Sequence, residues 1–506
     1  MLVHRLEELP PLAWLLDLQR SPPTLVCGAD VEIFEDGFFE GCWAGDFSTR
    51  DFDTACHVFG SGARQVGGSW LVVSPSHTME AVYLLVRQAG PLASNSLAFL
   101  CAWAEIELPF DRSIATRLFT AADGVDSYTR ELFRGPDWSI CRACFDNLEI
   151  GPDGVRYLAK PALEARFSDF TAYEAYLLAA LASVVANGAD PLRRFRYEIS
   201  STCSSGYDST ASTALAARLG ARRAFTISGA RGGGSDSGRP VIEQLGLEVV
   251  EVDRPLRPEG PGFPEAEFIG AGASGAEFPM FTLGPDLHHT LLLSGYFGGD
   301  LWGLEGPVSR TGRQDDTLGG SMAEFRLRCS FVHLPVAWIG FESLPELRRL
   351  CHSEAMRPWR VETGYERPIA RRLLEESGVS RGSFGTVKRA TAISFDYASF
   401  WWSKAALAEL RELERRQLGT WRAWLAYHLD GLARSCAFTT YFAVRRLCKQ
   451  AGLEKRLDDL RTRLVPSFYR LKMTHPRYGS LAFLWGQAKI RSRYPKARDV
   501  EPTPRS

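Results

Sequence analysis

The run FRYEISSTCSSGYDSTASTALAARLGA, residues 195–221, does most to limit what this chain can fold into. Its alternating apolar residues predict a strand, its small residues predict a turn, and its alanine-rich end predicts a helix. Such a turn lets backbone N–H groups approach an anion, and a helix N-terminus favours negative charge. Asp208 lies in the same turn, and a carboxylate beside an anion site indicates that a cation binds there as well. The run therefore predicts a site for phosphate and a metal ion, and hence for a nucleotide.

The segments that follow repeat this alternation of strand and helix. After the strand that ends near residue 200, further strands are predicted over 222–228 and 247–253, with helices between them. This order predicts βαβ units and a parallel sheet with its ligands at the carboxyl ends of the strands. The glycine-rich stretch GARGGGSDSG, 229–238, follows the second strand, where we expect a flexible loop near the ligand.

The pattern changes twice along the 506 residues, which are enough for two or three domains. Residues 1–165 contain β-like runs separated by Gly and Pro, and predict a β-rich domain. Residues 166–400 predict the parallel-sheet domain, which opens with a helix over 169–188. Residues 401–506 predict a helical extension packed on that domain. The predicted fold class is therefore α/β.

Composition and charge narrow the class of protein further. The chain is 45% hydrophobic and 24% charged, as in ordinary globular proteins, and its net charge of −1 gives no general attraction to nucleic acid or anionic membranes. Its first residues lack the pattern of a secretory signal, and no apolar run approaches the ~18 residues that span a bilayer. We expect a cytoplasmic protein without a membrane or nucleic-acid partner, and interpret the basic stretch 489–498 as a polar tail.

Cysteines and histidines raise the question of a metal. Eleven cysteines at irregular spacings fit reduced thiols, and Cys141 and Cys144 form a CxxC pair without a second pair nearby, so two partly buried cysteines are the preferred interpretation. His288 and His289 are adjacent. Neighbours on a regular element point apart, so we expect substrate contact or capping instead of one shared metal. Cys203 is expected to be a small core residue, although a thiolating enzyme would also place a cysteine there.

The stretch SSGYDST, 204–210, resembles the Ser-Gly-Gly-X-Asp-Ser pyrophosphate loop of the ATP pyrophosphatase superfamily. That superfamily includes asparagine synthetase, argininosuccinate synthetase, GMP synthetase and tRNA-thiolating enzymes. Ser205 stands where the family usually has its first glycine. Serine is small and keeps its N–H, so the turn is compatible with it if the backbone φ there is negative.

Two later segments are similar to the asparagine synthetase branch. The segment LLLSGYFGGDLWG, 291–303, resembles the strand and loop whose sequence in this branch is Thr-Gly-Asp-Gly-Gly-Asp-Glu-Leu-Phe-Gly. Asp300 falls on the glutamate of that loop, and Gly299 falls on the aspartate before it. Tyr296 stands where beta-lactam synthetases also carry a tyrosine. The segment 365–390 resembles the closing part of the synthetase domain, and Lys388 matches its lysine. The resemblance covers about residues 190–395.

The resemblance implies a role for each of these residues. ATP and Mg²⁺ are the expected ligands, with Asp208 and Asp300 holding the metal ion. Lys388 would neutralise the departing pyrophosphate, and Tyr296 is either a helper in deprotonating the nucleophile or simply packed. Backbone groups near Ile199, Ile227 and Gly295 are where the family contacts adenine. The phosphates would be held by Ser204, Ser205, Gly206, Asp208, Ser209 and Thr210.

The N-terminal region is faintly similar to a glutaminase-type sandwich. Glutaminases of this class open with a cysteine nucleophile, whereas this chain opens Met1-Leu2-Val3-His4. We therefore expect a degenerate glutaminase-like domain, with the amine supplied by the substrate, a second substrate or free ammonia.

The expected function is an ATP-dependent carbon–nitrogen ligase, releasing AMP and pyrophosphate, that joins a small-molecule or peptide carboxylate to an amine in specialised metabolite or peptide modification. One alternative is an adenylating enzyme that delivers sulfur or nitrogen to tRNA or nucleotides. Another is a non-catalytic nucleotide-binding descendant of the ligase. The sequence identifies neither the carboxylate and amine substrates nor the oligomeric state; a homodimer is one of the assemblies considered.

Overall fold

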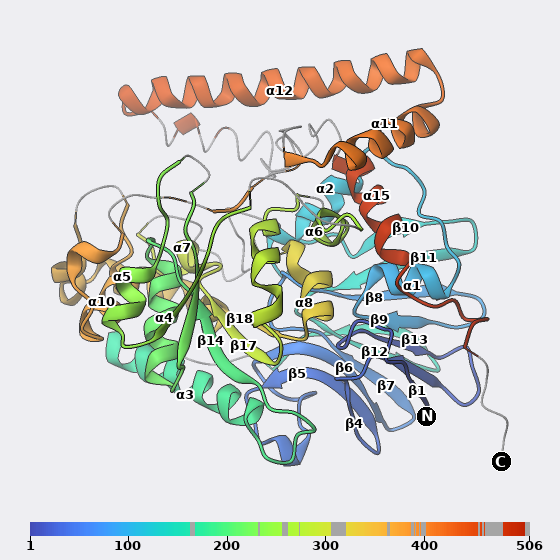
Figure 1. Cartoon of the computed structure of the whole chain (residues 1–506), viewed down its shortest axis with the longest axis horizontal. Helices are drawn as coiled ribbons and strands as arrows, with labels where there is room; N and C mark the ends of the chain where they lie inside the picture. Colours follow the sequence, from blue (N-terminus) through green and yellow to red (C-terminus); the bar gives the residue numbers. More distant parts are fainter. Residues whose placement is uncertain are drawn as a thin grey trace.

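The computed structural model shows a mixed α/β protein whose described residues form three β-sheets with helices around them (Figure 1). The residues that the structure does not describe are 162–166, 231–232, 256–261, 273, 305–319, 362–364, 386–388, 390, 394, 396–400, 454–455, 458–459, 461–478 and 501–506.

Two sheets make up the N-terminal region. One has the strand order β1-β3-β2-β9-β8-β11-β10, with β1 parallel to β3 and the other neighbours antiparallel; the second, antiparallel, has the order β13-β12-β7-β6-β5-β4. The strands are β1 (Leu2–Arg5), β2 (Trp14–Asp17), β3 (Thr24–Cys27), β4 (Glu32–Ile33), β5 (Gly37–Trp43), β6 (Val58–Val66), β7 (Ser69–Val73), β8 (Val82–Arg87), β9 (Leu92–Ser94), β10 (Glu131–Arg134), β11 (Trp138–Ala143), β12 (Asn147–Gly151) and β13 (Gly154–Leu158).

An apolar core joins these two sheets. Trp14 and Leu16 of β2 pack with Phe38 of β5 and with Trp70 and Val72 of β7, and all five side chains are buried. Side chains alternate between the faces of a strand, so residues two apart, such as Trp14 and Leu16, share the inner face. The predicted β-rich region is confirmed.

The third sheet is parallel and lies in the middle of the chain. Its order is β16-β15-β14-β17-β18, so the chain first builds outward from β14 and then returns to its other side. In a sheet of this kind a crevice opens at the carboxyl ends of the two strands where the order reverses, here β14 and β17. The strands are β14 (Glu198–Thr202), β15 (Arg223–Ile227), β16 (Glu248–Val252), β17 (Thr290–Ser294) and β18 (Val332–Pro335).

Helices cover the parallel sheet and connect it to the N-terminal region. α4 (Asp208–Arg218) packs on β14 and β17, and α10 (Pro368–Glu376) packs on α4. The other helices up to residue 352 are α1 (Leu97–Trp103), α2 (Ile114–Phe119), α3 (Phe170–Gly188), α5 (Arg239–Gln244), α6 (Glu265–Gly272), α7 (Gly298–Leu301), α8 (Ala323–Cys329) and α9 (Leu344–His352).

Helix α3 changes one expectation from the sequence. Among the described residues it is the one helix long and apolar enough to cross a membrane, by length and composition only, whereas we expected no such run. Asp169 caps it by accepting a hydrogen bond from the Ala172 N–H at 2.9 Å. Its buried face, including Leu177 and Leu181, joins the core beside the parallel sheet. A single helix of this kind is a weak indication of a membrane span, because core helices meet the same criteria.

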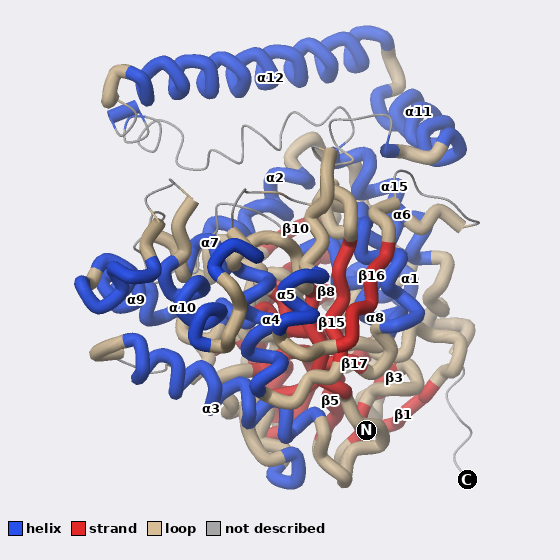
Figure 2. Tube along the Cα trace, turned by 60° about the vertical axis from the view of Figure 1, so that its left-hand side comes forward, coloured by secondary structure: helices blue, strands red, loops and turns tan. Residues whose placement is uncertain are grey.

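The C-terminal part contains α11 (Lys404–Leu418), α12 (Trp421–Gln450) and α15 (Gly479–Arg491). α12 runs along the top of the molecule in both views (Figures 1 and 2). α15 crosses α6 closely, since a Cβ at Gly486 would lie 2.6 Å from the Gly270 backbone N. α15 also contacts α1 and α2. The helical extension therefore packs on the N-terminal region as well as on the parallel-sheet part.

A buried ion-pair cluster joins the N-terminal region to α8. Arg326 donates to both carboxylate oxygens of Glu40, at 2.7 and 2.8 Å, and its Nε lies 2.7 Å from Glu80. All three side chains are buried. Burial raises the pKa of Glu80 to about 7, although Arg326 acts to lower it. The ion pairs, with hydrogen bonds from Ser61 and Asn95 to Glu40, compensate for the hydration that these buried charges lose.

Candidate nucleotide site

The serine-rich loop predicted from the sequence lies at the reversal point of the parallel sheet. It follows β14, which ends at Thr202, and leads into α4 at Asp208. β17 pairs with β14 and ends at Ser294, so the second predicted segment begins beside the first. The structure thus brings together two loops about 90 residues apart in sequence, at the edge where ligands bind in sheets of this kind.

Side-chain hydroxyls shape the loop from within. The Ser204 N–H donates to Ser209 Oγ at 3.0 Å, and the Gly206 N–H donates to Ser204 Oγ at 3.2 Å. The Thr210 hydroxyl is buried and donates to the Gly206 carbonyl at 2.6 Å. These hydroxyls order the backbone of the turn, and the Thr210 hydroxyl is directed into it and not toward a ligand.

Ser205 is compatible with the turn because it is not among the described residues with a positive φ. Its hydroxyl donates to Asp236 Oδ1 at 2.6 Å, and its N–H donates to the Asp236 carbonyl at 3.0 Å. Burial raises the pKa of Asp236, against the hydrogen bonds from Ser205. Asp236 belongs to the glycine-rich stretch after β15, so this part of the stretch lies beside the serine loop.

Asp208 begins α4, and two glycines of the second loop lie against it. A Cβ at Gly295 would come within 2.3 Å of the Ser209 backbone N, and a Cβ at Gly298 within 2.7 Å of the Asp208 Cβ. The helix N-cap residue, Tyr207, provides no side-chain cap. The first turn of a helix has N–H groups without intrahelical partners, so this end of α4 suits an anion.

Asp300 lies in the short helix α7, two residues after Gly298. Its carbonyl oxygen accepts a hydrogen bond from Arg348 at 2.7 Å, which holds α7 in place. Phe297, before α7, has a φ of +71° and stacks on Trp338 with ring centroids 4.8 Å apart. The sharp turn at this residue brings α7 back against α4.

Arg367 and Tyr365 complete the site and were missed by the sequence analysis. Arg367 Nε lies 3.8 Å from Asp208 Oδ1, and its guanidinium lies beside Gly299 and Gly303. Burial, with the charge of Asp208, raises the pKa of Tyr365 to about 12. Both residues open the segment 365–390 that the resemblance identified, but only its lysine was taken as functional. The arginine in that segment was the available signal.

Lys388 lies outside the described residues. Described residues on both sides of it cross the carboxyl edge of the sheet. The Gly385 N–H donates to the Ser205 carbonyl at 2.9 Å, and Arg389 donates to the Ser235 carbonyl. The Thr391 carbonyl accepts from Arg254 at 2.9 Å. Gly385, Arg389 and Thr391 thus contact the loops that follow β14, β15 and β16.

Tyr296 packs edge-on against His333 of β18, with ring centroids 5.4 Å apart. His333 in turn shares a 2.7 Å hydrogen bond with the Ser294 hydroxyl. Burial lowers the pKa of His333 to about 3, so this histidine is neutral at physiological pH. The packed arrangement matches the second of the two interpretations offered for Tyr296.

The proposed adenine contacts are only partly brought together. Ile227 ends β15 and Gly295 follows β17, so both lie at the carboxyl edge. Ile199 is the second residue of β14, three residues before its carboxyl end, and is buried in the core cluster with Leu181. A strand advances about 3.3 Å per residue, which places Ile199 roughly 10 Å from that edge.

The cysteines of interest are buried or partly buried. Burial raises the pKa of Cys203 to about 12, so its thiol is a poor nucleophile at neutral pH. Cys141 lies in β11 and Cys144 just after it, and all eleven cysteines of the chain are free. Among the described residues, the one group of three or more potential metal-binding side chains consists of Asp30, His288 and His289.

In comparisons with known proteins, no family model matches this chain and no curated protein matches it.

Proposed function

We propose that this protein is an ATP-dependent ligase of the asparagine synthetase-like class, which activates a carboxylate as its AMP ester and transfers the acyl group to an amine. The observation that carries the proposal is the contact of Gly295 and Gly298 with Asp208 and Ser209. It joins two sequence motifs of this class at the reversal point of a parallel sheet. On this proposal the N-terminal region is a degenerate glutaminase-like domain.

The residues at this point fit a nucleotide triphosphate with a magnesium ion. Asp208 offers carboxylate oxygens, which Mg²⁺ prefers, beside a helix N-terminus that favours phosphate. Its side chain is 25% exposed, so it is accessible to an ion. Asp300 would be the second carboxylate. Bound Mg²⁺ would bridge phosphate oxygens and neutralise their charge.

The cationic residues would act on the leaving group. When the substrate carboxylate attacks the α-phosphorus of ATP, the bond to the β-phosphate oxygen breaks and pyrophosphate carries away the negative charge. Arg367, beside Asp208, and Lys388 would stabilise that charge. The amine then attacks the acyl carbon and AMP leaves with its electron pair. Gly385, Arg389 and Thr391 contact the loops at the carboxyl edge and would restrict water from the ester.

The substrates we propose are a small-molecule or peptide carboxylate and an amine, in specialised metabolism or peptide modification. The sulfur-delivering alternative would need a reactive thiol near the nucleotide, and Cys203, adjacent to the loop, is buried with a raised pKa. The ligase is therefore favoured over a thiolating enzyme.

The test has two measurements on one set of variants. Titration calorimetry with MgATP measures binding, and exchange of labelled pyrophosphate into ATP, screened over carboxylic acids, measures activation. We expect Asp208→Asn and Asp208→Ala to abolish exchange while circular dichroism shows an unchanged fold. Asp137→Asn, an exposed position between β10 and β11, is the matched control and should behave as wild type.

Two results would contradict the proposal. If the wild-type protein does not bind MgATP, the site is not a nucleotide site. If Asp208→Asn supports exchange at the wild-type rate, Asp208 does not hold the metal ion. Binding without exchange for any acid would support the non-catalytic alternative.

A further inference from the structure

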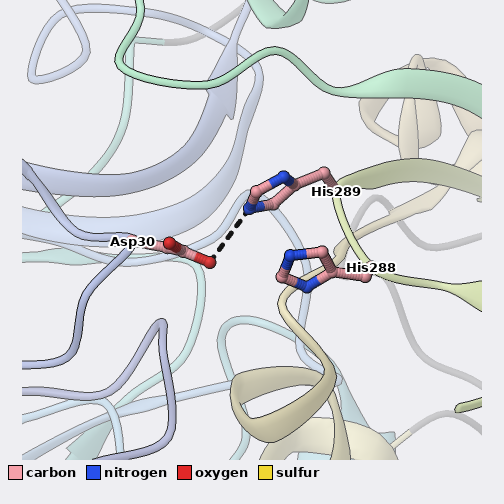
Figure 3. Close-up of side chains that lie close together, drawn as sticks. All are labelled: Asp30, His288 and His289. Atoms are coloured by element: carbon pink, nitrogen blue, oxygen red, sulfur yellow. Dashed lines mark hydrogen bonds and ion pairs between the residues drawn. The ribbon is translucent and has the colours of Figure 1, made fainter. Parts of the chain in front are cut away.

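Asp30, His288 and His289 lie together (Figure 3), and the two histidines stand at the amino end of β17 in the parallel sheet. One potential ligand atom from each of the three side chains lies within 4.8 Å of the other two. Asp30 belongs to the N-terminal region, between β3 and β4, whereas the histidines directly precede β17. The group therefore spans two parts of the chain more than 250 residues apart in sequence.

The two adjacent histidines lie on the same side, contrary to the sequence expectation. His289 has a φ of +52°, which turns its side chain away from the direction that a regular strand would give. Its N–H donates to the Ser330 carbonyl at 2.8 Å, and its carbonyl accepts from the Glu198 N–H at 2.8 Å. As a result the rings of His288 and His289 stack with centroids 3.8 Å apart.

Neighbouring groups already orient two of the three side chains. His289 Nε2 lies 3.0 Å from Asp30 Oδ2, and the Ser330 hydroxyl donates to the same oxygen at 2.6 Å. The Phe195 ring stacks on His289 with centroids 4.3 Å apart. The Ser330 hydroxyl and the Phe195 ring lie outside the three side chains, and metal-binding side chains are commonly held by such outer contacts.

We infer that Asp30, His288 and His289 bind one Zn²⁺ ion through one carboxylate oxygen and two imidazole nitrogens. This set of donors suits zinc, with a water in the fourth position, whereas Mg²⁺ and Ca²⁺ take oxygen ligands. Zinc binds an imidazole through an unprotonated ring nitrogen, so the contact between His289 and Asp30 gives way to a bond from each side chain to the ion. His288 is exposed, so the ion reaches the site from solvent.

The zinc ion would connect the N-terminal region directly to the parallel sheet. His289 precedes the amino end of β17, and the proposed nucleotide site lies at the carboxyl end of the same strand. Five residues of strand separate them, or roughly 16 Å. The zinc site is thus distinct from the proposed magnesium site and does not rest on the proposed function.

The test uses the full chain, freed of metal by a chelator and with its accessible thiols blocked by alkylation. Zn²⁺ alone is titrated in competition with a chromophoric chelator, and bound metal is counted by mass spectrometry after gel filtration. We expect one zinc per chain, and at least tenfold weaker binding for His288→Ala and Asp30→Asn. His352→Ala removes another exposed histidine and should bind as wild type.

A second readout separates the site from nonspecific binding. Zinc bound only by the folded chain raises its Tm, so we expect a zinc-dependent rise for the wild type and none for His288→Ala. His288 is exposed, so this variant should fold even if Asp30→Asn does not. The proposal is overturned if thiol-blocked wild-type protein binds no zinc, or if His288→Ala binds it with wild-type affinity.

Discussion

Gly295 lies directly against the peptide that joins Asp208 to Ser209: a Cβ at this position would be 2.3 Å from Ser209 N and 2.4 Å from the Asp208 carbonyl carbon. Both atoms are backbone, so neither can move aside as a flexible side chain would. The end of β17 and the start of α4 therefore tolerate no side chain between them.

Gly295→Ala should push these two segments apart. We expect a loss of about 1–3 kcal/mol in the free energy of unfolding, the usual cost of overpacking, and loss of MgATP binding because the serine loop shifts. Urea unfolding and calorimetry measure the two effects. Gly382→Ala is the control, since a Cβ there meets nothing within 4 Å. Unchanged stability and binding in Gly295→Ala would show that the two loops are not held as described.

Arg367→Met removes the cation beside Asp208 and should weaken MgATP binding. A hydrogen bond from the Arg367 guanidinium to a phosphate oxygen would be charge-assisted, and such bonds contribute about 1.5–3 kcal/mol. Losing one should raise the Kd of the variant for MgATP roughly 10- to 100-fold. Titration calorimetry measures the Kd. Arg357→Met should leave it unchanged, because Arg357 is 78% exposed and pairs with Glu354, which is also exposed. A wild-type Kd in Arg367→Met would remove Arg367 from the proposed site.

Arg326→Met leaves Glu40 and Glu80 buried without their cation. Breaking a buried ion pair by removing one partner costs about 3–5 kcal/mol, so the free energy of unfolding should fall by that amount. Chemical unfolding measures it. The double variant Arg326→Met with Glu40→Gln should be less destabilised than the sum of the two single variants. Simple additivity would mean that the two side chains are energetically independent.

His333 should contribute to loss of stability in acid. Its pKa is about 3 in the folded chain, well below the ordinary value of 6.5, so below pH 6.5 the unfolded chain binds a proton that the folded chain does not. Its contribution to stability is complete above pH 6.5 and falls by about 1.4 kcal/mol per pH unit between pH 6.5 and pH 3.

The measurement is the difference in unfolding free energy between wild type and His333→Gln from pH 7 to pH 4. Buried groups that do not interact with His333 titrate equally in both proteins, so their effects cancel. The variant should gain stability relative to wild type as the pH falls. A pH-independent difference would show that His333 is not held neutral.

The order of strands and helices in the middle of the chain could be predicted because the signals are local. The turn at Ser204–Ser209, the strand before it and the helix after it are written in consecutive residues, and so is the glycine-rich stretch beside them. The rule that ligands bind at the carboxyl ends of parallel strands predicted the edge of the sheet where the serine loop lies.

The contacts between residues far apart in sequence could not be predicted, because they depend on how the chain folds back on itself and no local pattern encodes this. Arg367 reaches Asp208 across about 160 residues, and Asp30 reaches His289 only because the N-terminal region packs on the parallel sheet. The expectation that the adjacent side chains of His288 and His289 point apart was wrong, because it assumes a regular backbone and His289 has a left-handed φ.

The close crossing of α15 with α6, together with its contacts to α1 and α2, has a consequence during synthesis on the ribosome. The apolar faces of α1, α2 and α6 are completed only after residues near 491 have left the exit tunnel. Until then a nascent chain of more than 480 residues would expose those faces, so chaperones that hold apolar surface should associate with it late in translation.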